Sequence, residues 1–287
     1  MIEQSPIKAG LAASNPSSTI GRTNTELAGR QNGNDSVAVL PATGERLVPG
    51  GLADPLFRQH EARYVFAGKF VQGRRILDVA CGSGMGTKYL SSAGASATIG
   101  LDIDAEAISF AKKLYRECEF GQCDVTKLCI ANASVDVVVS FETIEHIEAQ
   151  STFLNECHRV LKPGGVLICS TPNLTLSKWG PGNPFHVREL TVKEFGDVVA
   201  SVFQDVRLFS QNRVTYPVWL LRTFLISTLE RLHLAGPIRE LLQISGKRSI
   251  RSGAEFRSNS SDIAGIEPCR DSFLIQPTFV IAVAKKG

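Results

Sequence analysis

Apolar positions in this chain follow two patterns, nearly unbroken apolar runs and stretches with an apolar residue every third or fourth position. Unbroken runs predict strands that are covered on both faces, as in a parallel sheet. These strands are expected at 75–79, 97–101, 135–141, 165–170, 202–209 and 278–285. The wider spacing predicts helices, expected at 54–64, 150–161 and 191–200.

The first of these runs, Arg75 to Val79, leads directly into a turn with glycine at positions 82, 84 and 86, followed by a helix. Glycine lets the backbone approach a ligand where a Cβ atom would collide. The ligand is expected at the carboxyl end of the strand. A phosphate-binding P-loop does not fit, because Lys88 comes one residue late and the four-residue gap between glycines is missing.

Acidic residues follow the next two elements. Asp102 ends the run 97–101, about 20 residues after the glycine turn, and an acid at that distance suits the hydroxyls of a ribose. Asp124 follows Gly121-Gln-Cys. An adenine needs an apolar slot and an acceptor for its amino group, which Ile103 and Asp124 together would supply. The alternative is that Asp102 or Asp124 only caps the following helix, although Asp104 is the better capping candidate.

With these motifs the chain resembles the class I S-adenosylmethionine (SAM)-dependent methyltransferases, including the ubiquinone-type O-methyltransferases of small molecules. The motifs that carry the resemblance occupy 78–84, 101–104, 123–125, 135–147 and 161–166. The resemblance implies an α/β fold with a doubly wound, Rossmann-like sheet of seven strands, the last antiparallel. The chain departs from the family pattern at Ala80, which occupies the place of the usual first loop glycine.

The resemblance also implies a set of SAM contacts. It places Gly82 and Gly84 at the methionine moiety, Asp102 at the ribose, and Asp124 with Val125 at the adenine, with Ile103 against the ring. The predicted SAM site consists of Asp78, Ala80, Cys81, Gly82, Gly84, Asp102, Ile103, Asp124, Val125, Phe141, Arg63 and Tyr64.

The N-terminal region divides into a tail at 1–40, expected to be disordered from its Ser, Asn, Gly and Gln content, and a lid segment at 41–72. Similar methyltransferases fold such a segment over the SAM pocket. There Arg63 would meet the cofactor's carboxylate and Tyr64 would close the site. The alternative is a solvated arginine and a packed tyrosine.

The candidate catalytic residues are Glu142, Glu145 and His146, just past the strand 135–141, together with His186. If a helical turn begins at Glu142, the first three share one face. Two carboxylates and imidazole suit Mg²⁺ or Mn²⁺, and related O-methyltransferases hold a divalent ion at such a pattern. His146 or His186 could instead act as the general base, or the group could be structural.

The core, 73–212, is separated from its final strand at 276–287 by an insertion at 213–275. Leucines at 221, 225, 229 and 232 form a stripe on a predicted helix, and basic residues outnumber acidic ones in the insertion. This helix is expected to cap the acceptor site, to form a homodimer face, or to lie on an anionic membrane surface through 213–242.

Composition limits the alternatives. A chain of 287 residues with 43% hydrophobic content can bury a sizeable core, and a net charge of +3 does not favour nucleic acid as a partner. The seven cysteines form no Cys-x-x-Cys pair, which fits reduced thiols in a cytoplasm. No run of 18 uncharged apolar residues predicts a membrane span.

The expected function is O-methylation of a hydroxyl on a saccharide or another small molecule. The saccharide is favoured slightly, because Thr43 to Gly50 resembles a segment of methyltransferases that accompany surface-glycan assembly. The alternatives are a catalytically silent SAM-binding partner or sensor, and an N- or C-methyltransferase of a small molecule. The Asn-Pro-Pro-Tyr-type signature for planar amines is absent, since the equivalent positions are Ser140 to Thr143.

Overall fold

The computed structural model describes residues 55–178, 183–218, 221, 224, 266–269, 272 and 275–287. The predicted tail at 1–40 and most of the predicted insertion at 213–275 lie outside these residues, as do the capping, dimer and membrane roles expected of that insertion. Among the described residues, no helix has the length and apolar character needed to cross a membrane. No disulfide joins any of the seven cysteines, all of which are described.

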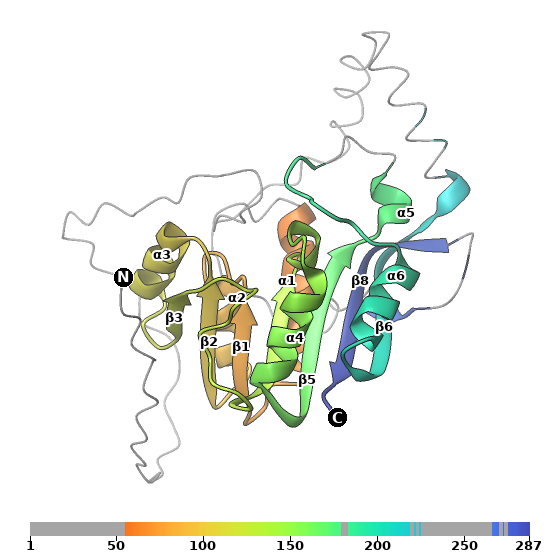
Figure 1. Ribbon diagram of the computed structural model, residues 1–287. Coiled ribbons are helices and arrows are strands. Elements are labelled where there is room, and N and C mark those ends of the chain that lie inside the picture. Colours follow the sequence, from red (N-terminus) through yellow and green to blue (C-terminus); the bar gives the residue numbers. More distant parts are fainter. Residues whose placement is uncertain are drawn as a thin grey trace, which may run out of the picture.

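A single twisted sheet forms the centre of the molecule (Figure 1). Its strands are β1 (Arg75–Val79), β2 (Ala97–Asp102), β3 (Glu119–Gln122), β4 (Val135–Phe141), β5 (Leu161–Pro172), β6 (Gln204–Thr215), β7 (Ile266–Pro268) and β8 (Ile275–Lys285). They are arranged in the order β3-β2-β1-β4-β5-β8-β6-β7. The pairs from β3 to β5 are parallel, and β8 is antiparallel to both β5 and β6. The doubly wound topology with an antiparallel last strand is therefore confirmed.

Two details of the sheet differ from the sequence prediction. The sheet has eight strands rather than seven, because three residues of the expected insertion, Ile266–Pro268, pair with the edge strand β6 at Phe209–Gln211. In addition, β6 continues to Thr215, where it still pairs with Ile275 of β8. The boundary expected at residue 213 thus falls inside a strand, since backbone pairing with β8 extends the strand beyond its apolar run.

Helices cover both faces of the sheet. They are α1 (Pro55–Gly68), α2 (Met85–Ser92), α3 (Ala105–Leu114), α4 (Gln150–Val160), α5 (Leu174–Ser177) and α6 (Val192–Ala200), with a 3₁₀ turn, η1, at Ile144–His146. Phe153 of α4 and Phe195 of α6 pack in one apolar cluster with Leu77 and Val138 of the sheet. On the other face, α1 and α2 pack against alternate strand positions such as Val137.

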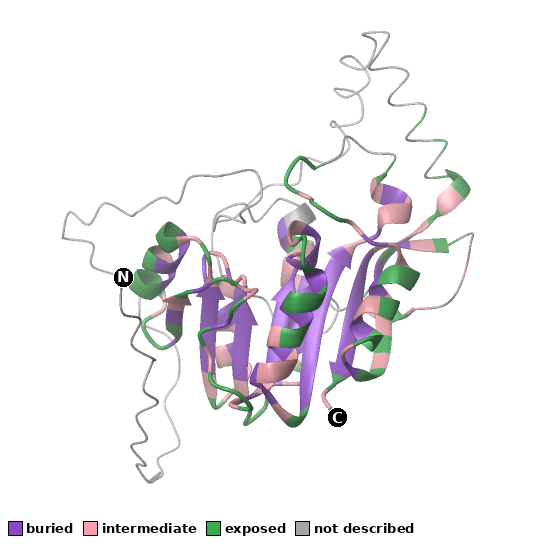
Figure 2. Cartoon of the chain, in the orientation of Figure 1, coloured by how far each residue is buried: buried purple, intermediate pink, exposed green. Residues whose placement is uncertain are grey.

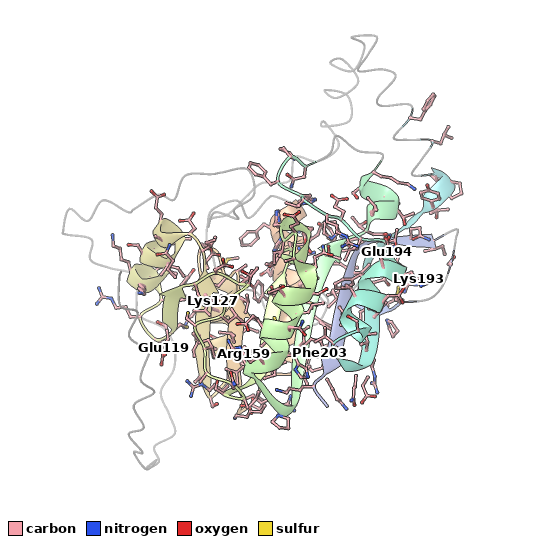
Figure 3. The ribbon with its side chains drawn as sticks, in the orientation of Figure 1. Glu119, Lys127, Arg159, Lys193, Glu194 and Phe203 are labelled. Atoms are coloured by element: carbon pink, nitrogen blue, oxygen red, sulfur yellow. The ribbon has the colours of Figure 1, made fainter. Side chains whose placement is uncertain are left out.

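Burial follows this layering, with the strands buried and the outer helix faces exposed (Figure 2). Side chains also fix where helices begin. Asp104 accepts hydrogen bonds from the N–H groups of Glu106 and Ala107, which confirms it as the cap of α3. Thr191 and Glu194, the latter labelled in Figure 3, form a capping box at the start of α6.

Candidate active site

One cavity of about 1150 Å³ opens at the carboxyl ends of the parallel strands. Its glycine end is formed by residues at the ends of β1, β2 and β3, which are Ala80–Ser83, Met85, Gly86, Asp102–Asp104 and Asp124–Thr126. Its histidine end is formed by His60 of α1, by residues after β4 and by loop residues, which are Glu142, Thr143, Glu145, His146, Asn183, Phe185, His186 and Glu189. Carboxyl ends of parallel strands meet at one edge of a sheet, so ligand sites concentrate there.

The glycine turn owes its shape to left-handed backbone. Gly84 has a φ of 80°, and a Cβ atom there would lie 2.7 Å from the side chain of Ala111 and 2.8 Å from that of Phe120. Gly84 therefore allows close packing of the turn on α3 and does not line the cavity. Ala80 also has a positive φ, 60°, at the position where the family has glycine.

Tyr64 of α1 closes the glycine end from one side. Its ring lies over Gly86, where a Cβ atom would approach the ring to 1.9 Å, and meets Phe141 edge-on at 5.0 Å between centroids. Its hydroxyl donates to Asp78 at 3.1 Å. Tyr64 thus lines the cavity, as the lid prediction requires, while its contact with a cofactor stays a prediction.

Asp78 lies beneath the turn rather than in the cavity wall. It is buried at the end of β1 and accepts hydrogen bonds from the hydroxyls of Thr87, at 2.7 Å, and Tyr64. Burial raises the pKa of its carboxyl from 3.8 to about 7, against the opposing effect of these two hydroxyls. The structure gives Asp78 the role of joining α1, α2 and the turn.

Asp102 uses its carboxylate to hold the turn. It accepts a hydrogen bond from the N–H of Gly82 at 2.7 Å and another from the N–H of Asp104 at 2.9 Å. It does not cap α3, since Asp104 does so. Ile103 is 66% exposed within the cavity wall, an apolar surface open to a ligand. This end therefore has the space, acid and apolar side chain that an adenosine group requires.

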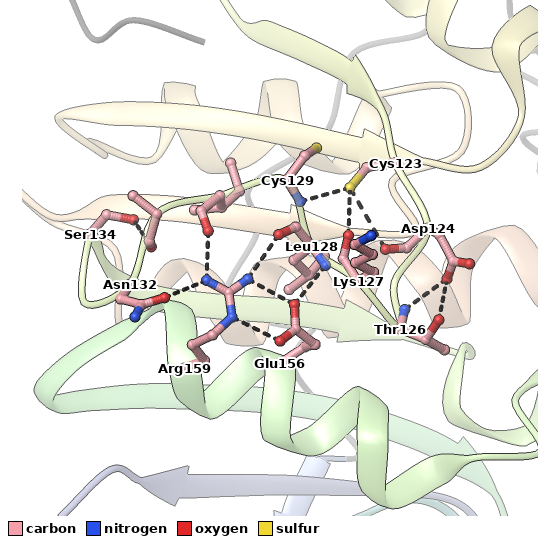
Figure 4. A network of polar contacts seen from close by, with 12 residues as sticks. Cys123, Asp124, Thr126, Lys127, Leu128, Cys129, Asn132, Ser134, Glu156 and Arg159 are labelled. Atoms are coloured by element: carbon pink, nitrogen blue, oxygen red, sulfur yellow. Dashed lines mark hydrogen bonds and ion pairs between the residues drawn. The ribbon is translucent and has the colours of Figure 1, made fainter. Parts of the chain in front are cut away.

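Asp124 accepts hydrogen bonds from both the N–H and the hydroxyl of Thr126 at 2.8 Å, and these bonds lower its pKa. The loop that follows is held by Arg159 of α4, which donates to the carbonyls of Leu128 and Ile130 and to Glu156 (Figure 4). Asp124 and Val125 line the cavity, at the glycine end. The bracing fixes their position before any ligand arrives.

Arg63 occupies a different place from the one expected. Its side chain is fully buried and absent from the cavity wall. The guanidinium donates to Gln211 of β6 at 2.9 Å, lies 3.7 Å from Glu142 and stacks over the Phe279 ring at 4.6 Å. A direct contact with a cofactor carboxylate is therefore not offered by this geometry, because the sheet and Glu142 already surround the charge.

Glu142 does not begin a helical turn, contrary to the expectation. Its φ is 53°, in the left-handed region, and the 3₁₀ turn η1 begins only at Ile144. The carboxylate accepts a hydrogen bond from the hydroxyl of Ser170 at 2.6 Å and faces Arg63. Glu142 lines the cavity, and its carboxylate lies between Ser170 of β5 and Arg63 of α1.

Glu145 is buried, and its Oε2 atom accepts a hydrogen bond from Thr171 at 3.2 Å. Within the described structure its Oε1 atom has no hydrogen-bond partner. Burial, and then the charge of Glu142, raises the pKa of this carboxyl well above 4.5. Its backbone carbonyl accepts from the N–H groups of Val187 and Arg188, which draws the loop containing His186 to the site.

His146 and His186 meet edge-on, with 4.9 Å between ring centroids. His146 Nδ1 lies 3.0 Å from the carbonyl oxygen of Phe185, so Nδ1 carries the proton and Nε2 the lone pair. His186 Nδ1 contacts Glu189, and its Nε2 lies 2.9 Å from Asn183 Nδ2. Asn183 Oδ1 accepts the N–H of Phe185, which fixes the amide with its NH₂ group toward His186.

Three of the four residues expected to bind a metal lie close together, and their role as metal ligands stays a prediction. Glu145, His146 and His186 each offer a ligand atom, and these atoms lie within 4.8 Å of one another. Glu142 is not in the group. The partnerless Oε1 of Glu145 fits a cation, whereas His186 Nε2 would first have to release Asn183.

Several wall residues were not assigned a site role from the sequence. His60 lies one helical turn before Tyr64, a spacing of four that places both on one face of α1. Asn173 directly follows β5, as Glu142 directly follows β4. A search for polar residues just after the parallel strands would therefore have found it. Phe279 lines the wall from β8, and its antiparallel direction hid it from a search of strand carboxyl ends.

Comparison with known proteins gives a consistent result. Residues 77–169 match the family described as "Methyltransferase domain". The chain is 40% identical over 174 residues to a probable S-adenosylmethionine-dependent methyltransferase of Mycolicibacterium smegmatis, covering 59% of this chain and 67% of that protein. A probable S-adenosylmethionine-dependent methyltransferase of Mycobacterium tuberculosis is 36% identical, with 60% and 65% covered. The match thus spans about two thirds of these relatives.

More distant similarities are shorter or concern the fold alone. The mitochondrial ubiquinone biosynthesis O-methyltransferase of Rattus norvegicus is 38% identical over 116 residues, 38% of this chain and 33% of that protein. A SAM-dependent methyltransferase structure from Archaeoglobus fulgidus matches with a TM-score of 0.51 at 17% identity, covering 80% of this chain and 93% of that one.

Proposed function

This chain belongs to the S-adenosylmethionine-dependent methyltransferases, and we propose that within this family it methylates a hydroxyl group on a small molecule. The observation that supports the proposal is the continuity of the cavity. Its glycine end, with Asp102 and Ile103, and its histidine end, with His146, belong to one open cavity. A hydroxyl held near His146 would therefore lie beside a methyl donor bound at the glycine end.

The tautomer of His146 suits it to remove the hydroxyl proton. Its Nδ1–H donates to the carbonyl of Phe185, so Nε2 presents a lone pair. SAM supplies an electrophilic methyl group, and attack by the hydroxyl oxygen forms the O–C bond while the C–S bond breaks to release S-adenosylhomocysteine. The proton passes to His146 Nε2. His186 is held by Glu189 and Asn183 and would help to orient the acceptor beside His146.

A metal-assisted version of the same reaction is a second candidate, supported by the cluster of Glu145, His146 and His186. These residues would hold a divalent ion, which would lower the pKa of a hydroxyl bound to it. With Glu142 outside the cluster, the ligands are one carboxylate and two imidazoles rather than mainly oxygens. That set favours Mn²⁺ over Mg²⁺.

The nature of the acceptor is the finer part of the proposal. The similarity to the ubiquinone biosynthesis O-methyltransferase of Rattus norvegicus, which covers about a third of that protein, supports transfer to oxygen. The saccharide preference rests on Thr43 to Gly50, which lie outside the described residues. N- or C-methylation and a catalytically silent SAM-binding role stay as alternatives, and a binding module has no need of the His146 and His186 pair.

The test is transfer from labelled SAM to a panel of catechols, quinols, glycosides and RNA ends, with and without chelator. His146→Asn should lower the transfer rate by roughly 10²–10⁴-fold and leave SAM affinity unchanged. His158→Asn is the matched control, because His158 lies on α4 against Phe203, outside the cavity wall. Tight SAM binding with no transfer would favour the silent partner, and chelator-insensitive transfer would exclude the metal.

A further inference from the structure

The charge of the cavity wall has one sign. Carboxylic side chains occur at both ends, Asp102, Asp104 and Asp124 at the glycine end and Glu142, Glu145 and Glu189 at the histidine end. Of the described residues that line the cavity, none is a lysine or an arginine. A ligand that enters the histidine end therefore meets carboxyl groups, and none of the described wall residues there is a permanent cation.

The buried arginine of α1 does not change this. Arg63 is fully buried beneath the wall, where Gln211 takes its hydrogen bond and Glu142 lies 3.7 Å away. The ring of Phe279, itself a wall residue, covers its guanidinium. Its charge is thus directed at Glu142 and separated from the cavity by an aromatic ring.

The histidines supply hydrogen-bonding groups rather than a fixed cation. His186 directs Nδ1 at Glu189, so any positive charge on it is shared with that carboxylate. His60 stands on the α1 side of the cavity, and burial, followed by the charge of Arg63, lowers its pKa well below 6.5. At neutral pH the α1 wall is therefore uncharged.

From this arrangement we propose that the acceptor carries no negative charge near the hydroxyl that is methylated: it is an uncharged polyol or phenol, and carboxylated or phosphorylated analogues are excluded. The proposal rests on the proposed function and deepens it. A carboxylate or phosphate placed at the histidine end would lose its hydration and face Glu142 and Glu189 without a counter-ion. An uncharged hydroxyl compound only exchanges hydrogen bonds with water for hydrogen bonds with imidazoles and carboxylates.

The test measures binding rather than turnover, so that it does not depend on catalysis. The complex with S-adenosylhomocysteine is titrated, with chelator present, with matched probes followed by saturation-transfer NMR and calorimetry. The pairs are catechol against 3,4-dihydroxybenzoate and methyl glucoside against methyl glucuronide. We expect each uncharged member to bind at least about tenfold more tightly than its anionic partner, a difference of about 1.4 kcal/mol.

A charge added to the wall should reverse this preference. His60→Lys places an ammonium on the α1 side and should shift the affinity ratio toward the anionic member at least about fivefold. His60→Gln, which is polar but uncharged, is the matched control and should leave the ratio as it is. Phe185→Lys, at a wall position that is 53% exposed, serves if the substitution in α1 impairs folding.

The outcomes separate the two proposals. Equal or tighter binding of the anionic probes, lack of binding by all four probes, or a ratio that neither lysine variant shifts would overturn the uncharged-acceptor proposal. Preferential binding of the uncharged probes supports it even where no methyl transfer occurs. Binding without transfer to any acceptor would count against the proposed O-methyltransferase activity instead.

Discussion

The two ends of the cavity are built in different ways. At the glycine end, each carboxylate bonds to a backbone group close in sequence, as Asp124 does to Thr126, or to the adjacent strand turn, as Asp102 does to Gly82. At the histidine end, side chains from remote segments meet: Arg63 and Gln211 are 148 positions apart, and His146 and Phe185 are 39 apart. Contacts between residues close in sequence suit a site for the methyl donor, which is the same throughout the family. Contacts between remote segments allow the acceptor site to differ from one family member to another.

The two ends also differ in how fully their polar groups are satisfied. Near the histidine end, Glu145 Oε1 and the Nε and Nη2 atoms of Arg63 are buried without a partner in the described structure. No wall residue described at the glycine end has such an atom. A buried polar group without a partner costs about 1–3 kcal/mol, so a ligand or a proton that pairs with Glu145 Oε1 would recover free energy at the histidine end.

The largest predicted effect comes from Arg63→Met. Removing the guanidinium leaves the partly buried carboxylate of Glu142 without its cation and Gln211 without its donor, and the free energy of unfolding should fall by about 3–5 kcal/mol in urea titrations. Lys162→Met breaks a half-exposed pair with Asp136 and should cost at most about 1 kcal/mol. SAM affinity of the folded Arg63 variant should stay near that of the native protein. A large loss of SAM affinity would instead support the contact between Arg63 and the cofactor that the sequence predicts.

The second effect is a pH dependence carried by Asp78. In the unfolded chain its carboxyl loses a proton near pH 3.8, but in the folded protein only near 7. Between these values the folded state binds more protons, so this group's contribution makes the free energy of unfolding fall as pH rises from about 4 to about 7. Asp78→Asn removes that contribution.

The measurement for Asp78 is the difference in unfolding free energy between Asp78→Asn and the native protein. Relative to the native protein, the variant should gain roughly 2–4 kcal/mol between pH 4 and pH 8. Asp136→Asn, at the amino end of β4, is the control, because hydrogen bonds from Lys162 and the N–H of Arg75 outweigh burial and lower the pKa of Asp136. Its difference from the native protein should have the opposite slope only below about pH 4 and should be nearly flat from about pH 5 to about pH 8. A flat difference for Asp78 would mean that its carboxyl is ionised in the folded state.

This contrast between the ends also explains what the sequence could predict. Asp102 and Ile103 directly follow an apolar run, and Asp124 follows the next short segment, Gly121-Gln-Cys. Strand pattern and chain order therefore place all three at one edge, and the structure has them in the wall. Asp78 and Gly84 occur in the same motif but serve packing, as the collision of a Cβ atom at Gly84 with Phe120 shows. Spacing in sequence does not separate a residue that touches a ligand from one that supports it.

The histidine end was predictable in its residue types but not in its geometry. His146 and His186 do come together, because the backbone of Glu145 binds the loop at Val187 and Arg188. The helical face proposed for Glu142 fails, because its φ of 53° turns the chain before η1 begins. The position of the Arg63 side chain is determined by its hydrogen bond to Gln211 of β6. Sequence spacing cannot predict that this strand lies against α1.

A third prediction concerns SAM affinity. Asp102→Asn weakens the charged acceptor that Gly82 and Asp104 share, and the affinity for SAM should fall by about 10–100-fold in calorimetric titrations. Asp136→Asn removes an equal charge at the opposite edge of the sheet and should leave the affinity unchanged. Equal losses of SAM affinity in both variants would indicate a long-range charge effect. The affinity would then not depend on the local contacts of Asp102 at the glycine end.

The smallest predicted effect concerns Ala80, where this chain departs from its family. A non-glycine residue at a φ of 60° costs roughly 1–2 kcal/mol, whereas glycine costs roughly 0.5–1 kcal/mol in the unfolded chain. Ala80→Gly should therefore raise the free energy of unfolding by about 0.5–1 kcal/mol and shift SAM affinity little, because the turn keeps its shape. Asn212→Gly, at a φ of 52° on β6, is a matched control with a smaller expected gain, since asparagine tolerates this region. If Ala80→Gly weakens SAM binding instead, the methyl group of Ala80 contacts the cofactor, and the strained alanine contributes to binding at the glycine end.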